Sequence, residues 1–82
     1  MDVAQANATI GANLRALRAK KGYSREKLSE LTDVPVITIR RIEDGERAGQ
    51  APILLTLVRA LGSTGKDFFD AVEAELDQIS KP

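Results

Sequence analysis

The sequence predicts an all-α domain of five short helices. Its 82 residues are divided by glycines and prolines into short segments rich in Leu, Ala, Arg, Lys and Glu. Within these segments the apolar residues recur three and four positions apart, which is the spacing of one face of a helix. No run alternates between apolar and polar residues, and no residue pair typical of a β-hairpin turn is present. The expected helices cover residues 8–21, 24–31, 35–43, 51–61 and 65–79.

Gly22 and Ser24 separate the first two helices. Glycine ends a helix readily because it adopts the left-handed conformation, and basic side chains in the last turn favour that end. Serine caps the next helix by accepting a hydrogen bond from a free backbone N–H. The first helix begins either at residue 8 or nearer Val3. The expected buried residues of these two helices are Ile10, Leu14, Leu17, Leu28 and Leu31.

The other three helices begin at or near Pro35, Pro52 and Thr64. Proline suits a first turn, where its missing N–H costs no hydrogen bond, and threonine caps a helix as serine does. Gly45 and Gly62 end the third and fourth helices. The expected buried residues are Ile39, Ile42, Leu54, Leu57, Val58, Leu61, Phe68, Phe69 and Val72. The apolar stripe of the fifth helix continues through Leu76 and Ile79, which have no obvious cover within the chain.

The composition argues against catalytic and metal-binding chemistry. The chain has no cysteine and no histidine, so it lacks thiolate ligands and the commonest general base. We therefore expect no enzymatic activity, no cofactor and no metal site. The length indicates a single domain over residues 1–82. No apolar run approaches the ~20 residues that span a bilayer, and the N-terminus lacks a signal-peptide pattern, so a cytoplasmic protein is expected.

Charge is unevenly distributed along the chain, although its 12 basic and 12 acidic residues cancel. The region from Arg15 to Arg41 has eight basic and three acidic residues, a balance of +5. The region from Lys66 to the end has two basic and five acidic residues, a balance of −3. The first region therefore suits phosphate groups and the second repels them.

The segment from Ser24 to Gly45, SREKLSELTDVPVITIRRIEDG, resembles the Xre/Cro-type helix-turn-helix family, whose fold is phage lambda-repressor-like. The similarity covers roughly residues 8–72 and leaves 73–82 as a helical C-terminal extension. It implies a compact five-helix domain that binds double-stranded DNA as a homodimer on an operator and regulates transcription. Ser29 is the small residue expected where the two helices of the motif touch. Asp33 occupies the turn, where the family usually has Gly, and aspartate tolerates positive φ.

The resemblance also implies which side chains contact DNA. In this family the third helix lies in the major groove, and its first residues approach the base edges. The positions that match base-reading residues are Val36, Ile37, Thr38 and Arg41. The positions that match phosphate contacts are Arg18, Arg25, Arg40 and Arg47. Arg18 and Glu43 match a family pair in which the acid either directs the arginine toward the DNA backbone or forms a purely structural ion pair.

Val36 and Ile37 depart from the family pattern, which often has polar residues at these positions. Apolar side chains in the major groove recognise the methyl group of thymine, whereas Arg41 is suited to paired hydrogen bonds with guanine. Two neighbouring apolar residues are also typical of a surface that binds another protein. The sequence leaves both interpretations open.

The fifth helix is a candidate for the dimer contact, because it runs past what the family domain needs to close its core. The residues expected to form this contact are Val72, Leu76 and Ile79. The alternative is that they cover the first helix within one monomer.

Three functions are compatible with the sequence. The first is a transcriptional regulator that occupies an operator. The second is an antitoxin-type protein of the same fold, whose partner is a toxin or another regulator. The third is a protein-interaction module that has lost DNA binding.

Overall fold

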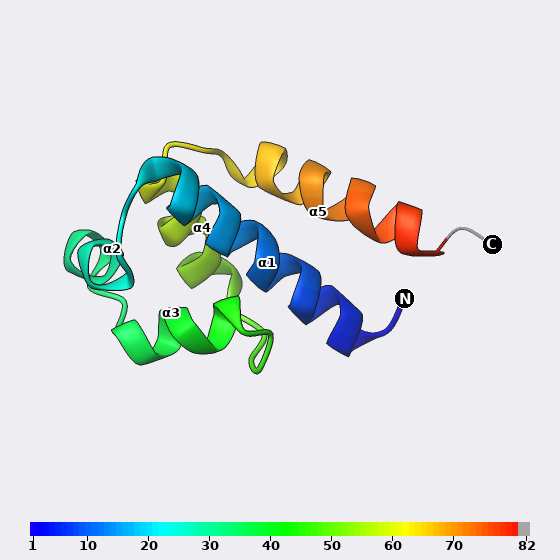
Figure 1. Ribbon diagram of the computed structural model, residues 1–82, viewed down its shortest axis with the longest axis horizontal. Helices are drawn as coiled ribbons and strands as arrows, with labels where there is room; N and C mark the ends of the chain where they lie inside the picture. Colours follow the sequence, from blue (N-terminus) through cyan, green and yellow to red (C-terminus); the bar gives the residue numbers. More distant parts are fainter. Residues whose placement is uncertain (81–82) are drawn as a thin grey trace.

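The computed structural model describes residues 1–80 and contains five α-helices (Figure 1). Their bounds are α1 Val3–Lys21, α2 Arg25–Thr32, α3 Val36–Glu43, α4 Ala51–Ala60 and α5 Gly65–Ser80. No strand occurs in the described residues, and the predicted all-α fold of five helices is confirmed. None of these helices is both long and apolar enough to cross a membrane.

α1 begins at Val3, well before residue 8, and so agrees with the earlier of the two predicted starts. Asp2 and Gln5 form a capping box that satisfies its first turn. The Asp2 carboxylate accepts a hydrogen bond from the Gln5 backbone N–H at 2.8 Å, and the Gln5 side chain accepts one from the Asp2 N–H at 3.0 Å. All other helix bounds lie within one residue of the predicted ones. Ser24 and Thr64 cap α2 and α5 as predicted.

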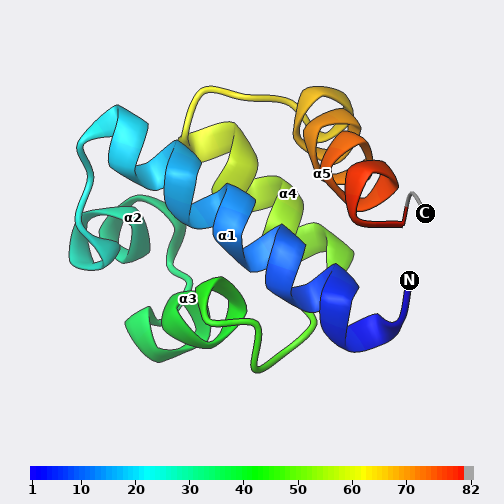
Figure 2. The ribbon, with the colours of Figure 1, turned by 45° about the vertical axis from the view of Figure 1, so that its right-hand side comes forward.

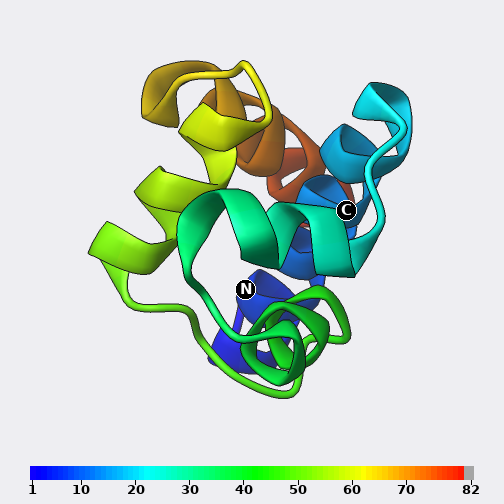
Figure 3. The same cartoon turned by 90° about the vertical axis from the view of Figure 1, so that its left-hand side faces the viewer.

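α1 lies between α3 and α5 and packs against both (Figures 1 and 2). α5 runs antiparallel to α1, so the start of α1 and the end of α5 lie at the same end of the molecule. α2 packs against α3 and α4, and Figure 3 shows α2 lying across the view while α3 is seen nearly end-on. This arrangement leaves the outer side of α3 at the surface, on the opposite side of α1 from α5.

All five helices contribute to one hydrophobic core. Burial of a large apolar side chain contributes about 1.5–3 kcal/mol, so this cluster supplies most of the favourable free energy of folding. The fully buried side chains are Leu14, Leu28, Ile39, Ile42, Leu57 and Val58. The remaining core residues are Val34, Leu54, Leu61, Phe68 and Val72.

Two residues predicted to be buried are exposed, Leu31 by 50% and Phe69 by 41%, and Ile79, at the end of the α5 stripe, is 54% exposed. Leu31 lies on a helix of only 8 residues, whose contacts with its neighbours bury Leu28 alone. Phe69 lies about 100° around α5 from Phe68, which occupies the core. Ile79 lies in the last turn of α5, beyond the residues that pack against the core. The three- and four-residue spacing of apolar residues therefore predicted which face of each helix is buried, but not how far around or along the helix the buried face extends.

The turn between α2 and α3 has the positive φ predicted for Asp33, with a value of 60°. Its backbone N–H donates to the Ser29 carbonyl at 2.8 Å and so ends α2. The next residue, Val34, is buried in the core. The turn is thus fixed by the hydrogen bond of Asp33 on one side and by the burial of Val34 on the other.

The backbones of α1 and α3 approach each other closely at Gly11 on α1. A Cβ atom at this position would lie 2.6 Å from the carbonyl oxygen of Glu43 and closer still to that of Ile42. Only glycine therefore allows α1 to reach the last turn of α3. This contact is separate from the one between α2 and α3, for which Ser29 was predicted as the small residue and where it is half-buried. Gly11 was not predicted.

We predict that Gly11→Ala lowers the free energy of unfolding by about 1–3 kcal/mol, because the backbones of α1 and α3 must move apart. Helix propensity alone predicts the opposite sign, since alanine is favoured over glycine by up to about 1 kcal/mol. Gly65→Ala is the matched control, because its Cβ would make an ordinary 3.5 Å contact with Leu55. Urea unfolding of both variants measures the difference. A Gly11→Ala variant as stable as the wild type would contradict this account of the contact.

Candidate nucleic-acid interface

α3 buries one face and turns the other to solvent. Ile39 and Ile42 lie in the core, whereas Ile37, Arg40 and Arg41 are exposed. Ile37 and Arg41 are four residues apart and therefore lie side by side on the outer face. The structure thus presents an apolar side chain and a guanidinium group together at the surface of the molecule.

Val36 and Thr38, the other two candidates for base contact, are half-buried. Thr38 lies in a groove between α3 and α4, together with Arg47 from the connecting loop. The other residues that line this groove are Ile42, Ala48, Gly49, Gln50 and Ile53. Exposed Gln50, which was not predicted as a contact residue, carries an amide that can donate and accept hydrogen bonds.

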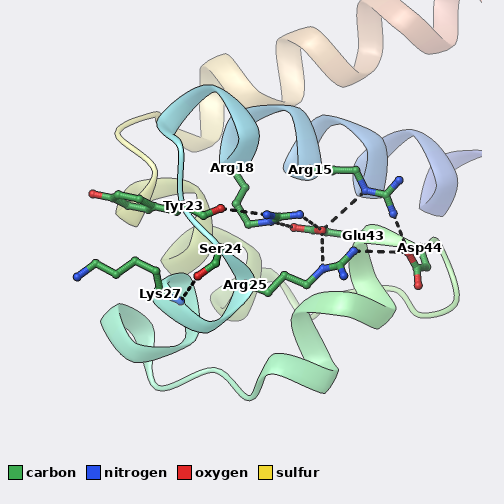
Figure 4. A network of polar contacts seen from close by, with 8 residues as sticks. All are labelled: Arg15, Arg18, Tyr23, Ser24, Arg25, Lys27, Glu43 and Asp44. Carbon is green, nitrogen blue, oxygen red and sulfur yellow. Dashed lines mark hydrogen bonds and ion pairs between the residues drawn. The ribbon is translucent and has the colours of Figure 1, made fainter.

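A buried carboxylate, that of Glu43, joins three helices at the inner end of this surface (Figure 4). Its side chain has no exposed area. Arg18 on α1 donates two hydrogen bonds to it, from Nε to Oε2 at 2.7 Å and from Nη2 to Oε1 at 2.9 Å. Arg18 also donates from Nη1 to the Tyr23 carbonyl at 3.0 Å. The predicted pairing of Arg18 with Glu43 is therefore present, and most of the Arg18 donors are used within the protein.

Two further arginines, Arg15 and Arg25, lie beside Glu43. Arg25, the first residue of α2, donates from Nε to Glu43 Oε1 at 3.0 Å. Arg15 on α1 donates from Nη2 to Asp44 Oδ1 at 2.7 Å, and its Nε lies 3.9 Å from Glu43 Oε1. We call Arg15, Arg18, Arg25, Glu43 and Asp44 the arginine–carboxylate cluster (Figure 4). Neither Arg15 nor Asp44 was among the predicted contact residues, because their proximity depends on how α1 crosses the end of α3.

The electrostatics of the cluster keep Glu43 ionised. Burial opposes ionisation of this carboxyl, but hydrogen bonds from Arg18 and Arg25 outweigh burial, so the pKa of Glu43 is lowered. The hydrogen bond with Glu43 raises the pKa of the Arg18 guanidinium in turn. Both groups are therefore charged throughout the physiological pH range, and α3 is attached to α1 by a permanent ion pair.

The predicted dimer contact needs one correction. Val72 is only 3% exposed and belongs to the core, because it lies on the same inner face of α5 as Phe68. It is therefore inaccessible to a partner. Leu76 is half-buried and packs against the core, and Ile79 is exposed. The apolar residues that α5 presents to solvent are thus Phe69 and Ile79, with Leu76 between them.

The charge separation seen in the sequence corresponds to two sides of the molecule. The basic segment forms α2, α3 and the end of α1, and the acidic segment forms α5, on the other side of α1 (Figure 1). Within residues 1–80 no group of three or more acidic side chains is arranged to hold a metal ion. The surface around α3 is therefore suited to an anionic partner through its arginines.

Residues 9–68 match the family of the helix-turn-helix domain, and the sequence matches none of the curated proteins. The fold is similar to the clp gene regulator ClgR from Corynebacterium glutamicum, with a TM-score of 0.84, 24% identity, and coverage of 92% of this chain and 80% of that one. A second structure of ClgR from C. glutamicum matches with a TM-score of 0.78 and 26% identity, and the match covers 84% of this chain and 88% of that one. The wild-type restriction-modification controller protein C.Esp1396I matches with a TM-score of 0.78 and 20% identity, and the match covers 87% of this chain and 93% of that one.

We predict that stability depends on ionised Glu43. Its pKa is lower in the folded state than in the unfolded chain, so its contribution is fully present above the ordinary glutamate value of about 4.3. The contribution is then lost as the pH falls through the lowered pKa. Glu43→Gln is expected to cost about 3 kcal/mol at neutral pH, because it leaves two arginines without their partner. The difference between wild type and this variant should shrink below about pH 4.

Urea unfolding followed by circular dichroism from pH 7 to pH 3 measures this difference. Glu30→Gln is the control, because Glu30 is an exposed glutamate on α2. A difference between wild type and Glu43→Gln that is independent of pH would show that the charge of Glu43 does not stabilise the fold.

Proposed function

Because this chain belongs to the helix-turn-helix domain family, with the Xre/Cro-type fold that its sequence resembles, we propose that it is a transcriptional regulator that binds a double-stranded DNA operator as a homodimer. The observation that carries the proposal is the outer face of α3. It presents Ile37 and Arg41 to solvent on a helix that is fixed from behind by the core and by Glu43. A rigid helix with exposed hydrogen-bond donors is what major-groove recognition requires.

Arg41 is proposed to read the sequence through a guanine, to which its guanidinium can donate two hydrogen bonds. Ile37, beside it, and half-buried Val36 are proposed to contact thymine methyl groups, the apolar feature of the major groove. Thr38 faces the groove that it shares with Arg47, and this supports a contact at the edge of the base-reading surface. The expected operator therefore combines guanine with neighbouring thymines.

Arg25, Arg40 and Arg47 are proposed to contact phosphates. All three lie around α3, at the start of α2, on α3 and in the loop that follows it. Such contacts hold the protein in register on the duplex without reading its sequence. For Arg18 we propose a different role from the predicted phosphate contact, because its side chain is only 16% exposed and is bonded to Glu43 and Tyr23. It positions α3 against α1.

The dimer contact is proposed to involve Phe69, Leu76 and Ile79 on α5. Phe69 and Leu76 are seven residues apart and Ile79 follows three later, so the three lie on neighbouring rows of the helix. The acidic residues Asp70 and Asp77 lie on a different side of α5 by the same spacing. A two-fold contact there would place two copies of α3 about 34 Å apart, one turn of DNA.

The function is tested by selecting bound sequences from random duplex DNA. We predict a preferred site made of two related half-sites about 10 base pairs apart, each with guanine next to thymine. Arg41→Ala is expected to lower affinity for this site by about 1–3 kcal/mol and to relax the guanine preference. Arg59→Ala, which removes an exposed arginine near the end of α4, is the matched control. Equal losses on selected and random duplexes would exclude base reading by Arg41.

Failure of the wild type to select any sequence would reject the proposed function. The exposed apolar side chain of Ile37 would then favour the second candidate, a protein such as a toxin or another regulator as the partner of α3. Co-purification of a defined protein that is lost on Ile37→Ser would establish that alternative.

We predict that the double substitution Phe69→Asp, Ile79→Asp converts the dimer to a monomer, because it places charges in an apolar contact. Leu76 is left unchanged in this test, since it packs against the core and its replacement would disturb the fold. Ala74→Asp is the control, because Ala74 is exposed on another side of α5. Sedimentation equilibrium measures the mass of each variant. A monomeric wild type, or a double variant that remains dimeric, would refute this placement of the contact.

A further inference from the structure

The exposed side of the arginine–carboxylate cluster holds more guanidinium groups than carboxylates. The three guanidinium groups of the whole cluster face two carboxylates, Glu43 and Asp44. Buried Glu43 binds Arg18 through both oxygens and so neutralises it inside the protein. Arg25 also donates to Glu43, and both Arg15 and Arg25 lie near Asp44, whose Oδ1 is 2.7 Å from Arg15 Nη2 and 4.0 Å from Arg25 Nη2. Glu26 adds a negative charge near Arg18. On the exposed side of the cluster two guanidinium groups thus face the single carboxylate of Asp44.

The two arginines that carry this excess also keep unused donors. Arg15 is half exposed and Arg25 is 28% exposed, whereas Arg18 is largely covered. Each guanidinium has five N–H donors. Within residues 1–80 only one hydrogen bond is made by Arg15, from Nη2, and one by Arg25, from Nε. The Nη1 groups of both arginines thus remain available to an anion that carries a single negative charge.

The position of the cluster matches the edge of the proposed DNA-binding surface. Ile37, Arg41 and Asp44 are spaced by four and three residues, so they lie along one side of α3. An anion held beside Asp44 would consequently lie next to the base-reading face. In a protein–DNA complex the groups found at such an edge are the backbone phosphates that flank the major groove.

We propose that Arg15 and Arg25 together form a clamp for one phosphate of the DNA backbone, with Asp44 and Glu43 holding the two guanidinium groups in place. This inference rests on the proposed function and adds Arg15 as a phosphate-binding residue. A phosphodiester carries one negative charge and two free oxygens, which match two neighbouring guanidinium groups whose Nη1 groups make no hydrogen bond within the described residues. Because the carboxylates fix both side chains beforehand, less conformational entropy is lost on binding.

The test compares Arg15→Ala with Lys66→Ala. Both substitutions remove one cation that is paired to a carboxylate, Arg15 with Asp44 at 2.7 Å and Lys66 with Asp70 at 2.8 Å. Binding of the full chain to a random-sequence duplex is measured at several salt concentrations. Loss of one phosphate contact reduces the slope of log affinity against log salt by about 0.9. We expect this reduction for Arg15→Ala and an unchanged slope for Lys66→Ala.

Three outcomes of this comparison decide the proposal. Recovery of the slope by Arg15→Lys, which retains the charge, would support a phosphate contact over a structural role. An unchanged slope in Arg15→Ala would overturn the clamp while leaving the proposed function intact. A loss of affinity by Arg15→Ala that is confined to the selected operator would also overturn it, because a phosphate contact acts equally on all sequences.

Titration of the wild type with inorganic phosphate separates the clamp from the proposed function. The Nε–H signals of Arg15 and Arg25 are expected to shift in arginine NMR spectra, whereas the signal of Arg59 stays in place. Shifts of both signals in a protein that binds no duplex would support the anion site and reject the DNA-binding function. The absence of both shifts would overturn the clamp.

Discussion

The ion pair between Glu43 and Arg18 is the constraint on which the arrangement of the helices depends. A buried carboxylate costs several kcal/mol of desolvation unless it is paired and fully hydrogen-bonded. Here both oxygens are occupied by arginines from α1 and α2, so α3 is joined to two other helices at a single point. Gly11 makes the pairing possible, because it lets the backbone of α1 approach the last turn of α3. The direction of the outer face of α3 follows from this contact.

The hydrophobic core and the ion pair of Glu43 with Arg18 restrain different parts of α3. Ile39 and Ile42 hold the inner side of α3 against the other helices, while Glu43 determines where its last turn lies along α1. Asp33 closes the other end of the unit with a left-handed turn. α3 is thus restrained at its start, along its length and at its end. A helix of only 8 residues would be unstable by itself, and these restraints account for its order.

The cluster also shows how one group of charges can serve the fold and a surface at once. Its buried half, Glu43 with Arg18, neutralises itself and stabilises the packing of α1 on α3. Its exposed half, Arg15 and Arg25 around Asp44, retains a positive charge. α5 carries five acidic residues on the other side of α1 from α3. A net charge of zero conceals this asymmetry.

The sequence by itself determined the helices, the caps at Ser24 and Thr64, the positive φ of Asp33 and the family, because these depend on local spacing and on a continuous run of residues. It also identified the core positions, except that Leu31 and Phe69, which were expected to be buried, are exposed. Only the tertiary structure decided which part of the molecule the apolar face of each helix packs against. It buried Val72, and it brought Arg15 to Asp44 although 29 residues separate them. Such contacts depend on the crossing of α1 and α3, and no local pattern encodes where two helices cross.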